Sequence, residues 1–397
     1  MNILTFTSLF PNSDQPNFGV FVKHRAVALA QQPNLNVRVV APVPYFPQSL
    51  NFSFVPAHWQ RMACLPEQEV IAGLATSHPR YFNPPKVGMR FYARWMARGA
   101  LAELKRLHRA APIDLIDAHY VYPDGAAAVM LGAALNVPVC VSARGTDINL
   151  FSTMPHIRPL MVDTLQRAQG IVAVSAALKQ RMVELGLAAD KIAVIRNGIE
   201  AELFYPRDKT AARQKLGLPP AAKIIVTVSA LVPLKGIDRL IDAMALMNES
   251  AARLFIIGQG SERAALQARI TQHGLAARIT LVGAKPQTEL GDWYAAADLF
   301  CLASHREGCP NVVVEALACG APVVASDVGG ISELVTDDRF GLLVPEAEAN
   351  APGFAARLQT ALQKDWSHKV IAESGGARGW GDVAQDVLTY WQARGLR

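Results

Sequence analysis

The sequence has few cysteines and no long uninterrupted apolar run. Its five cysteines are odd in number and none forms a Cys-x-x-Cys pair, so we expect a reducing compartment with no disulfide framework and no zinc site. Residues 1–10 lack the basic segment of a secretory signal peptide. The longest apolar stretch, residues 125–143, is interrupted by Asn136 and Pro138, which indicates a helix followed by a strand rather than a membrane span. We therefore expect a cytoplasmic protein.

Length and composition exclude a disordered chain. The 397 residues are 51% hydrophobic and 18% charged, which is apolar enough to form large cores. At about 100–200 residues per domain, this length favours two domains.

Short runs of β-branched and apolar residues alternate with helical patterns along most of the chain. Such alternation predicts buried parallel strands joined by crossover helices. Eleven strands are too many for one ordinary doubly wound domain, so we expect an α/β protein with two Rossmann-like, doubly wound parallel-sheet domains. The strands are expected at Ile3–Phe6, Val37–Ala41, Leu115–His119, Val139–Ser142, Ile171–Val174, Ala193–Ile195, Ile224–Val228, Arg253–Ile257, Ile279–Val282, Leu299–Leu302 and Val323–Ala325.

A turn and a polar linker mark the boundary between the domains. Asn197-Gly198 follows a strand, and residues 204–220 are polar and contain three prolines. Ligands of open parallel sheets bind at the carboxyl ends of the strands, so we expect the site in a cleft between two facing sheets. The expected domains are residues 1–205 and residues 206–379.

Residues 42–85 differ from this pattern. They hold eight of the 25 prolines, and proline interrupts regular structure. We expect irregular surface structure here, inside the first domain.

The most informative segment is residues 304–324, which read SHREGCPNVVVEALACGAPVV. A strand, a turn with Gly308 and Pro310, and a helix from about Asn311 follow one another. The helix N-terminus suits a phosphate group. Glu315 can accept two vicinal hydroxyls, as a ribose offers, and Glu307 lies where a second ring could be held. The alternative for a single glutamate is stabilisation of the helix dipole.

Two further strand-to-helix turns are candidates. Lys235, in VPLKG, can neutralise a diphosphate as a point charge; alone, it could equally be a solvated lysine. Gly19 lets the backbone approach a ligand closely or simply starts a helix.

These strings together resemble the retaining family-4 glycosyltransferases of the GT-B architecture. The likeness rests on Glu-x7-Glu, the following ALACGAPVVASDVGGISELV, the VPLKG lysine and the turn at residues 197–200, and it covers nearly the whole chain. The opening residues, HYVYPDG and SARGTDIN resemble the bacterial subgroup of teichuronic-acid and exopolysaccharide glycosyltransferases. The resemblance implies that the C-terminal helix, about residues 380–397, crosses back onto the acceptor-binding N-terminal domain.

The resemblance also implies roles for individual residues. Glu315 would hold the ribose of a nucleotide-sugar donor, Glu307 the hydroxyls of the transferred sugar, and Lys235 the diphosphate. Gly19 would let the N-terminal loop approach donor and acceptor. The diphosphate and sugar would be lined by Gly308, Cys309, Pro310, Asn311 and Val312, and the base would be bordered by Gly283, Ala284 and Lys285.

Two positions depart from the family pattern. Ser229-Ala230 stands where the family often has Gly-Arg, so one cation for the diphosphate is missing unless Arg263 or another arginine supplies it. Arg144 stands where the family often has histidine, and its charge could replace the one that Ala230 lacks. His119, Asp124 and Asp147 are acceptor-side candidates, although a core histidine and helix caps are the alternatives.

The expected reaction is metal-free, retaining glycosyl transfer of the hexosyl type to a glycan or lipid-linked acceptor in surface polysaccharide biosynthesis. No Asp-x-Asp occurs in the chain, so helix amides, Lys235 and Arg144 would stabilise the leaving diphosphate. The resemblance implies same-face attack, with a donor phosphate oxygen taking the acceptor proton. The rival hypotheses are a GT-B epimerase, a phosphorylase, and a non-catalytic partner that binds sugar nucleotides. No cofactor beyond the donor is expected.

The net charge of +6 is concentrated in one segment. Residues 78–110 hold eight basic residues and one acidic residue, so the rest of the chain is close to neutral. Arg90, Arg94 and Arg98 recur every four residues and would share a helix face, with aromatic residues beside them. Such a helix suits the anionic inner surface of a membrane. A solvated helix face is the alternative, and nucleic acid fits less well because no reading motif is present.

Overall fold

The computed structural model describes residues 1–45, 61–62, 64–84, 88–374 and 377–396. The chain divides into two compact units, Met1–Gly198 with Trp380–Arg397, and Ile199–Gly379. Residues just after Gly198 pack within the second unit. Ile199 forms a β-bridge with Gly379, and the ring of Phe204 lies 6.0 Å from that of Tyr294. The boundary therefore lies seven residues before position 205, where the polar, proline-containing linker had placed it.

The first unit is built on a sheet of eight described strands in the order β10-β9-β8-β7-β1-β2-β5-β4. All neighbours are parallel except β4 and β5. The central parallel strands are almost entirely buried, as parallel strands covered on both faces must be, whereas the edge strand β4 is partly exposed. The strands of this sheet are β1 (Asn2–Phe6), β2 (Asn36–Val40), β4 (Gln68–Ile71), β5 (Leu74–Ser77), β7 (Leu115–His119), β8 (Val139–Ala143), β9 (Gly170–Ala173) and β10 (Ile192–Val194).

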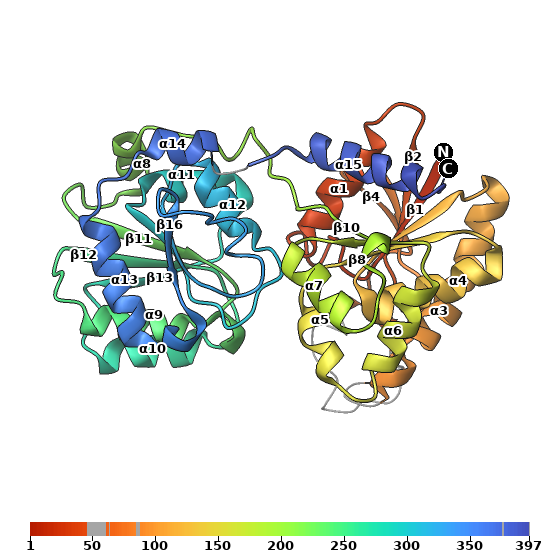
Figure 1. The fold of residues 1–397 in the computed structure, drawn as a ribbon, viewed down its shortest axis with the longest axis horizontal. Helices are drawn as coiled ribbons and strands as arrows, with labels where there is room; N and C mark the ends of the chain where they lie inside the picture. Colours follow the sequence, from red (N-terminus) through yellow and green to blue (C-terminus); the bar gives the residue numbers. More distant parts are fainter. Residues whose placement is uncertain (46–60, 63, 85–87, 375–376, 397) are drawn as a thin grey trace. The chain divides into compact units, whose positions relative to one another are not determined.

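Helices cover this sheet, and the two chain ends lie close together on it (Figure 1). The last helix, α15, packs against α1, where Trp391 and Leu29 are fully buried. The Tyr390 hydroxyl donates to the Lys191 carbonyl at 2.6 Å and accepts from the Ile171 amide at 2.9 Å. The C-terminal helix therefore belongs to the first unit. The helices are α1 (Val20–Ala30), α3 (Tyr92–Ala110), α4 (Ala126–Leu135), α5 (Thr146–Asn149), α6 (Arg158–Arg167), α7 (Ala176–Glu184) and α15 (Trp380–Ala393).

The expectation of irregular structure at residues 42–85 is wrong where this segment is described. Strands β4 and β5 form an antiparallel hairpin that extends the main sheet, and β3 (Val43–Tyr45) pairs with β6 (Arg80–Phe82). The hairpin turn consists of Ala72 and Gly73, with φ values of 52° and 83°. Positive φ at both positions is the tight-turn geometry that matches strand twist. Ala-Gly is a weaker signal for this turn than Asn-Gly. The many prolines around it therefore led to a prediction of irregular structure instead of a hairpin.

The second unit is an entirely parallel sheet of six described strands, ordered β13-β12-β11-β14-β15-β16. Its core includes Ile225, Leu254 and Ile256, all at most 1% exposed. The strands are β11 (Lys223–Val228), β12 (Ala252–Ile257), β13 (Ile279–Gly283), β14 (Leu299–Leu302), β15 (Val323–Ser326) and β16 (Gly341–Val344). The helices are α8 (Lys209–Leu216), α9 (Ile237–Leu246), α10 (Arg263–Gln272), α11 (Gln287–Ala296), α12 (Asn311–Ala318), α13 (Ala351–Gln363) and α14 (His368–Ser374).

All eleven expected strands are present, with ends within two residues of those predicted. The edge strand β16 was not predicted, because its four residues follow a charged loop and only two are fully buried. In the described parts of the chain, no helix combines the length and the hydropathy needed to cross a membrane.

Candidate functional site

The carboxyl end of β14 leads directly into the Glu307 loop and helix α12. The helix begins at Asn311 after the N-cap residue Pro310, whose side chain makes no capping hydrogen bond. Glu315 lies in the second turn and is 7% exposed. The Tyr294 hydroxyl of α11 donates a 2.9 Å hydrogen bond to Glu315 Oε2. The predicted ribose ligand is therefore a buried carboxylate whose orientation is set by a neighbouring helix.

Burial also changes the acidity of this carboxylate. The pKa of Glu315 is raised to about 7, chiefly by burial and also by Glu200, although hydrogen bonds from Tyr294 and Gln287 lower it. The pKa of Tyr294 is well above its usual value because of burial and the adjacent Glu315. Glu315 thus changes its charge near neutral pH, where an exposed glutamate is fully ionised.

Lys235 and Glu307 form an ion pair. Lys235 Nζ lies 2.6 Å from Glu307 Oε1, and the two side chains are 24% and 10% exposed. The turn that carries Lys235 comes close to the end of β14, since a Cβ on Gly236 would lie 2.2 Å from the Ala303 carbonyl oxygen. The structure thus brings together two residues 72 positions apart that were predicted to contact the same donor.

A second loop supports Glu307 and was missed in the sequence analysis. A Cβ on Gly329 would lie 2.0 Å from the Glu307 carbonyl oxygen, and the Gly330 amide donates to the Gly308 carbonyl at 2.9 Å. The Gly-Gly dipeptide after β15 is the signal that could have pointed to this close approach. Tyr294 was missed because a buried aromatic residue in a helix looks like core.

The remaining predicted residues of this unit lie at the same edge of the sheet. Gly283 ends β13 with φ at 91°, Ala284 is exposed, and Lys285 Nζ lies 3.1 Å from Glu289 Oε2. Pro310 has no amide proton, so it can shape the α12 entrance but cannot donate to a phosphate.

In the first unit, Arg144 lies just beyond the carboxyl end of β8. It is half-buried, donates to Asn197 Oδ1 at 2.9 Å, and also bonds His119 Nδ1. His119 itself has no exposed surface, and its second ring nitrogen lies 3.0 Å from Asp117 Oδ2. Both ring nitrogens are engaged inside the protein, so the alternative of a core histidine describes His119 better than contact with an acceptor.

Asp147 and Asp124 are also fully buried. Asp147 accepts from the backbone amides of Val121, at 2.8 Å, and Gly145, at 2.8 Å, so it organises the loop that carries Arg144. Asp124 accepts from the Ser8 amide. Both carboxylates bind backbone amides of loops, and neither is the N-cap of the helix beside it.

Gly19 begins α1 with φ at 65°. A Cβ there would lie 2.2 Å from the Leu9 carbonyl oxygen. The close approach that requires glycine is thus to the preceding loop of the same chain.

Arg90, Arg94 and Arg98 are exposed, as the spacing predicted, although Arg90 lies in the short helix Met89–Phe91 before α3. Trp95 lies between them and contacts the ring of Phe82 at 5.2 Å and that of Phe91 at 5.7 Å. Phe82 is 45% exposed. The basic surface therefore includes an aromatic cluster that is partly open to solvent. We call these six residues the basic–aromatic face.

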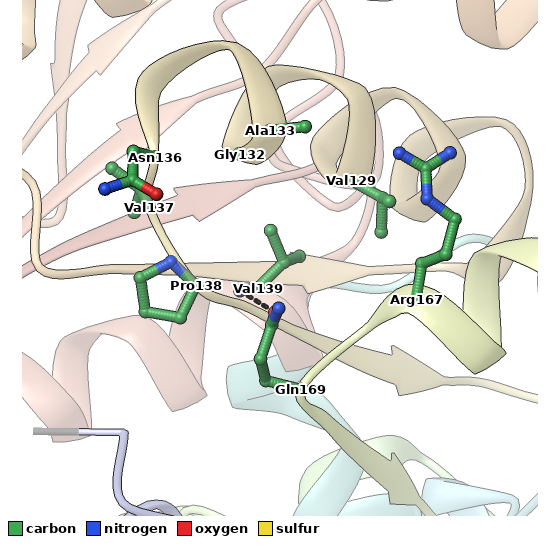
Figure 2. A pocket seen from close by; sticks show the side chains of 9 residues that line it. All are labelled: Val129, Gly132, Ala133, Asn136, Val137, Pro138, Val139, Arg167 and Gln169. Atoms are coloured by element: carbon green, nitrogen blue, oxygen red, sulfur yellow. Dashed lines mark hydrogen bonds between the residues drawn. The ribbon is translucent and has the colours of Figure 1, made fainter.

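A separate cavity of about 460 Å³ lies in the first unit, at the amino end of β8 (Figure 2). It is lined mainly by the end of α4 and by Arg167 and Gln169. Gln169 Oε1 accepts from the Val139 amide at 2.7 Å. The described residues that line this cavity include no carboxylate and no thiol, and it lies at the opposite end of the strands from Arg144. Among the described residues, no cluster of three potential metal ligands was found.

Two protein families and several relatives are similar to this chain. The family of glycosyl transferases group 1 matches residues 208–377, and glycosyltransferase family 4 matches residues 58–203. TuaC of Bacillus subtilis (strain 168), a glycosyltransferase assigned to teichuronic acid biosynthesis, is 32% identical over 87% of this chain and 86% of its own length. The chain is a group 1 glycosyltransferase.

Other relatives of this glycosyltransferase match it less completely. A D-inositol 3-phosphate glycosyltransferase of Segniliparus rotundus is 34% identical over 60% of this chain and 56% of its own length. Sucrose-phosphate synthase from Thermosynechococcus elongatus is 20% identical, with a TM-score of 0.73 over 100% of this chain and 96% of that one. HepE of Anabaena, solved with UDP and glucose, is 21% identical, with a TM-score of 0.72 over 99% of this chain and 100% of that one. These structures confirm the GT-B fold.

Proposed function

We propose that this glycosyltransferase moves a hexosyl group, with retention of configuration and without a metal ion, from a nucleotide sugar to a glycan or lipid-linked acceptor. The observation that carries the proposal is the Lys235–Glu307 ion pair beside the start of α12. It places one cation, one carboxylate and a helix N-terminus at a single strand end. A sugar diphosphate offers the matching groups, namely anionic oxygens and hydroxyls.

Each group has a distinct task in this proposal. The leaving diphosphate gains negative charge as the glycosidic bond breaks, so Lys235 and the α12 amides stabilise the transition state more than the ground state. Glu307 holds hydroxyls of the transferred sugar, and Glu315 holds the ribose. Arg144 offers a further positive charge to a substrate phosphate. Attack occurs on the face that the diphosphate leaves, and a donor phosphate oxygen takes the acceptor proton.

The contacts of the two glutamates argue against a double-displacement mechanism. A retaining hydrolase needs two carboxylates ~5–5.5 Å apart around the anomeric carbon, one of them free to act as nucleophile. Here Glu307 is paired with Lys235, and Glu315 is bonded to Tyr294 and is 7% exposed. Both carboxylates suit binding better than nucleophilic attack.

The acceptor proposal rests on the basic–aromatic face and on the kinship with TuaC. Three exposed arginines attract anionic headgroups, and Trp95 with Phe82 can enter the interfacial layer. We propose a cytoplasmic enzyme that associates peripherally with the inner membrane surface and contributes to surface polysaccharide biosynthesis.

The test is a panel of UDP-, GDP-, ADP- and dTDP-sugars offered to the purified protein. Both binding and slow donor hydrolysis are measured, and the anomeric configuration of the product is read by NMR. We expect one donor to bind and to be hydrolysed slowly with retention, and Glu307→Gln to reduce the hydrolysis. Binding without turnover would instead support a non-catalytic partner, and conversion into another sugar nucleotide would support an epimerase.

A further inference from the structure

A chain of buried polar side chains ends at Arg144 in the first unit. It starts at Ser142 on β8, passes through Arg25 on α1, and continues through two residues of β7. The contacts are Arg25 Nη1 to Ser142 Oγ at 2.9 Å, Arg25 Nη2 to Asp117 Oδ1 at 3.0 Å, His119 Nε2 to Asp117 Oδ2 at 3.0 Å, and Arg144 Nη2 to His119 Nδ1.

The hydrogen bonds among these buried side chains determine the protonation state of His119. Burial alone would raise the pKa of Asp117, but Arg25, His119 and Arg144 lower it below its usual range, so the carboxylate is ionised and can only accept. His119 Nε2 must therefore carry a proton. A guanidinium only donates, so Nδ1, which faces Arg144, must be unprotonated. His119 is thus the neutral tautomer with its proton on Nε2.

The charges around His119 agree with this state. The pKa of His119 is lowered to about 3, chiefly by burial and also by Arg144 and Arg25, and only Asp117 raises it. Arg25, Asp117 and His119 are at most 2% exposed, whereas Arg144 is half-buried. The network therefore ends at a residue that is partly exposed.

Arg144 is held from several sides. Its guanidinium also donates to Asn197 Oδ1 at 2.9 Å and lies 5.2 Å from the centre of the Phe21 ring. Its backbone amide donates to Asp147 Oδ1 at 3.0 Å. Removing the histidine acceptor would leave a guanidinium N–H without its partner and free the side chain to change rotamer.

We propose that His119 is a positioning residue for Arg144, held by Asp117 as the tautomer that can accept from the guanidinium. His119 does not touch the substrate; it acts by aiming a cation at a substrate phosphate. This rests on the proposed function, in which Arg144 contacts an anionic group of the donor or acceptor.

Asp117→Asn gives the sharpest test. Arg25 would require the oxygen of the introduced amide, so the amide NH2 would face His119 Nε2 and favour the opposite tautomer, with Nδ1–H against Arg144. A carboxylate-to-amide change beside a histidine can act in this way without disturbing the fold. Asp163→Asn is the matched control, because that carboxylate is exposed and pairs with Arg167, at 3.4 Å, on α6.

The first measurement needs no substrate. Two-bond proton–nitrogen NMR of histidine-labelled protein should show His119 with Nε2 protonated and Nδ1 bare at pH 7. Asp117→Asn should invert this pattern. The Arg144 guanidinium should give the NMR signals of an ordered side chain in the wild type and of a mobile side chain in His119→Leu. A protonated Nδ1 in the wild type would overturn the proposal, whatever the enzyme's activity.

The second measurement is a double-mutant cycle on transfer. Asp117→Asn should lower kcat/KM roughly 10- to 100-fold, the range known for losing a residue that orients a metal ligand. Arg144→Gln removes the proposed substrate contact itself and should lower kcat/KM at least as much. The double variant should be no worse than Arg144→Gln alone. His119→Asn, whose Oδ1 can stand in for Nδ1, should retain more activity than His119→Leu.

The two measurements separate the two possible failures. Additive losses, or a fully active His119→Leu, would overturn the positioning role even if transfer is confirmed. The expected tautomer in a protein that transfers no sugar would instead contradict the proposed function and leave the structural role of His119 standing.

Discussion

Lys235 Nζ lies 2.6 Å from Glu307 Oε1, so the cation and the carboxylate proposed for the donor site are paired with each other. A diphosphate must share Lys235 with Glu307. Each group thus sets the charge that the other presents to the donor. Replacing one should change how the other binds.

Glu307→Gln should reduce transfer at least tenfold, because a neutral amide holds the transferred sugar less strongly than a carboxylate. The affinity for the free nucleoside diphosphate should be kept or should rise, since Lys235 loses its competing partner. Calorimetry with the nucleoside diphosphate and initial rates of transfer measure the two effects. Glu346→Gln, an exposed acid of the same unit, is the control. Equal loss of affinity and turnover would assign Glu307 to the diphosphate instead.

The Tyr294–Glu315 hydrogen bond predicts a graded loss of nucleotide affinity. Glu315→Ala removes the ribose partner and should cost roughly 1.5–3 kcal/mol, whereas Tyr294→Phe only loosens that partner and should cost about 0.5–1.5 kcal/mol. Tyr390→Phe is the matched control, because its part-buried hydroxyl bonds backbone groups of the first unit. Tyr390→Phe should lower the melting temperature without weakening nucleotide binding. If Tyr294→Phe bound the nucleotide as tightly as the wild type, Tyr294 would have no role in nucleotide binding.

Glu315 also predicts a pH dependence. Its pKa of about 7 in the folded protein exceeds the usual value of 4.5 because of burial, so the folded state binds the proton more tightly than the unfolded state. Stability contributed by the protonated form should therefore be lost as pH rises from about 4.5 through 7. Thermal denaturation at pH 5 and pH 8 should show a larger drop for the wild type than for Glu315→Gln. If the melting temperatures of the wild type and of Glu315→Gln fell equally between pH 5 and pH 8, burial would not raise the pKa of Glu315.

Metal chelation should not abolish transfer. The proposed charge stabilisation comes from Lys235, Arg144 and the α12 amides, and the chain contains no Asp-x-Asp. Transfer assays with and without EDTA, and with magnesium added back, check this expectation. Complete loss with EDTA that magnesium restores would contradict the metal-free mechanism.

The basic–aromatic face predicts salt-sensitive membrane binding. Changing Arg90, Arg94 and Arg98 together to Gln should weaken co-sedimentation with anionic vesicles at low salt, at about 1 kcal/mol per basic residue near the surface. The control variant changes Lys223, Arg263 and Lys369, which are exposed residues of the second unit, and so removes the same charge elsewhere. If the wild type stays in the supernatant at low salt, the face is a solvated surface and the acceptor binds without it.

Local sequence signals determined most of this fold. Buried parallel strands are short, β-branched and apolar, and crossover helices have their own period, so eleven strands could be placed from residue types alone. Glu307, Glu315 and Lys235 were predicted to bind the donor because they follow strands and match the motifs of the family that the sequence resembles. The same logic failed at residues 68–77, where an Ala-Gly turn forms a hairpin that prolines on either side concealed.

Only the tertiary structure decided which side chains face one another. The pairs Lys235–Glu307, Tyr294–Glu315 and His119–Arg144 join residues 72, 21 and 25 positions apart. No local pattern encodes such contacts, because they depend on which strand ends and helices the sheet places side by side. The buried state of His119, and the tautomer that it must adopt, follow from those contacts. A sequence shows that a histidine is present, whereas the donors and acceptors packed around it determine what it can do.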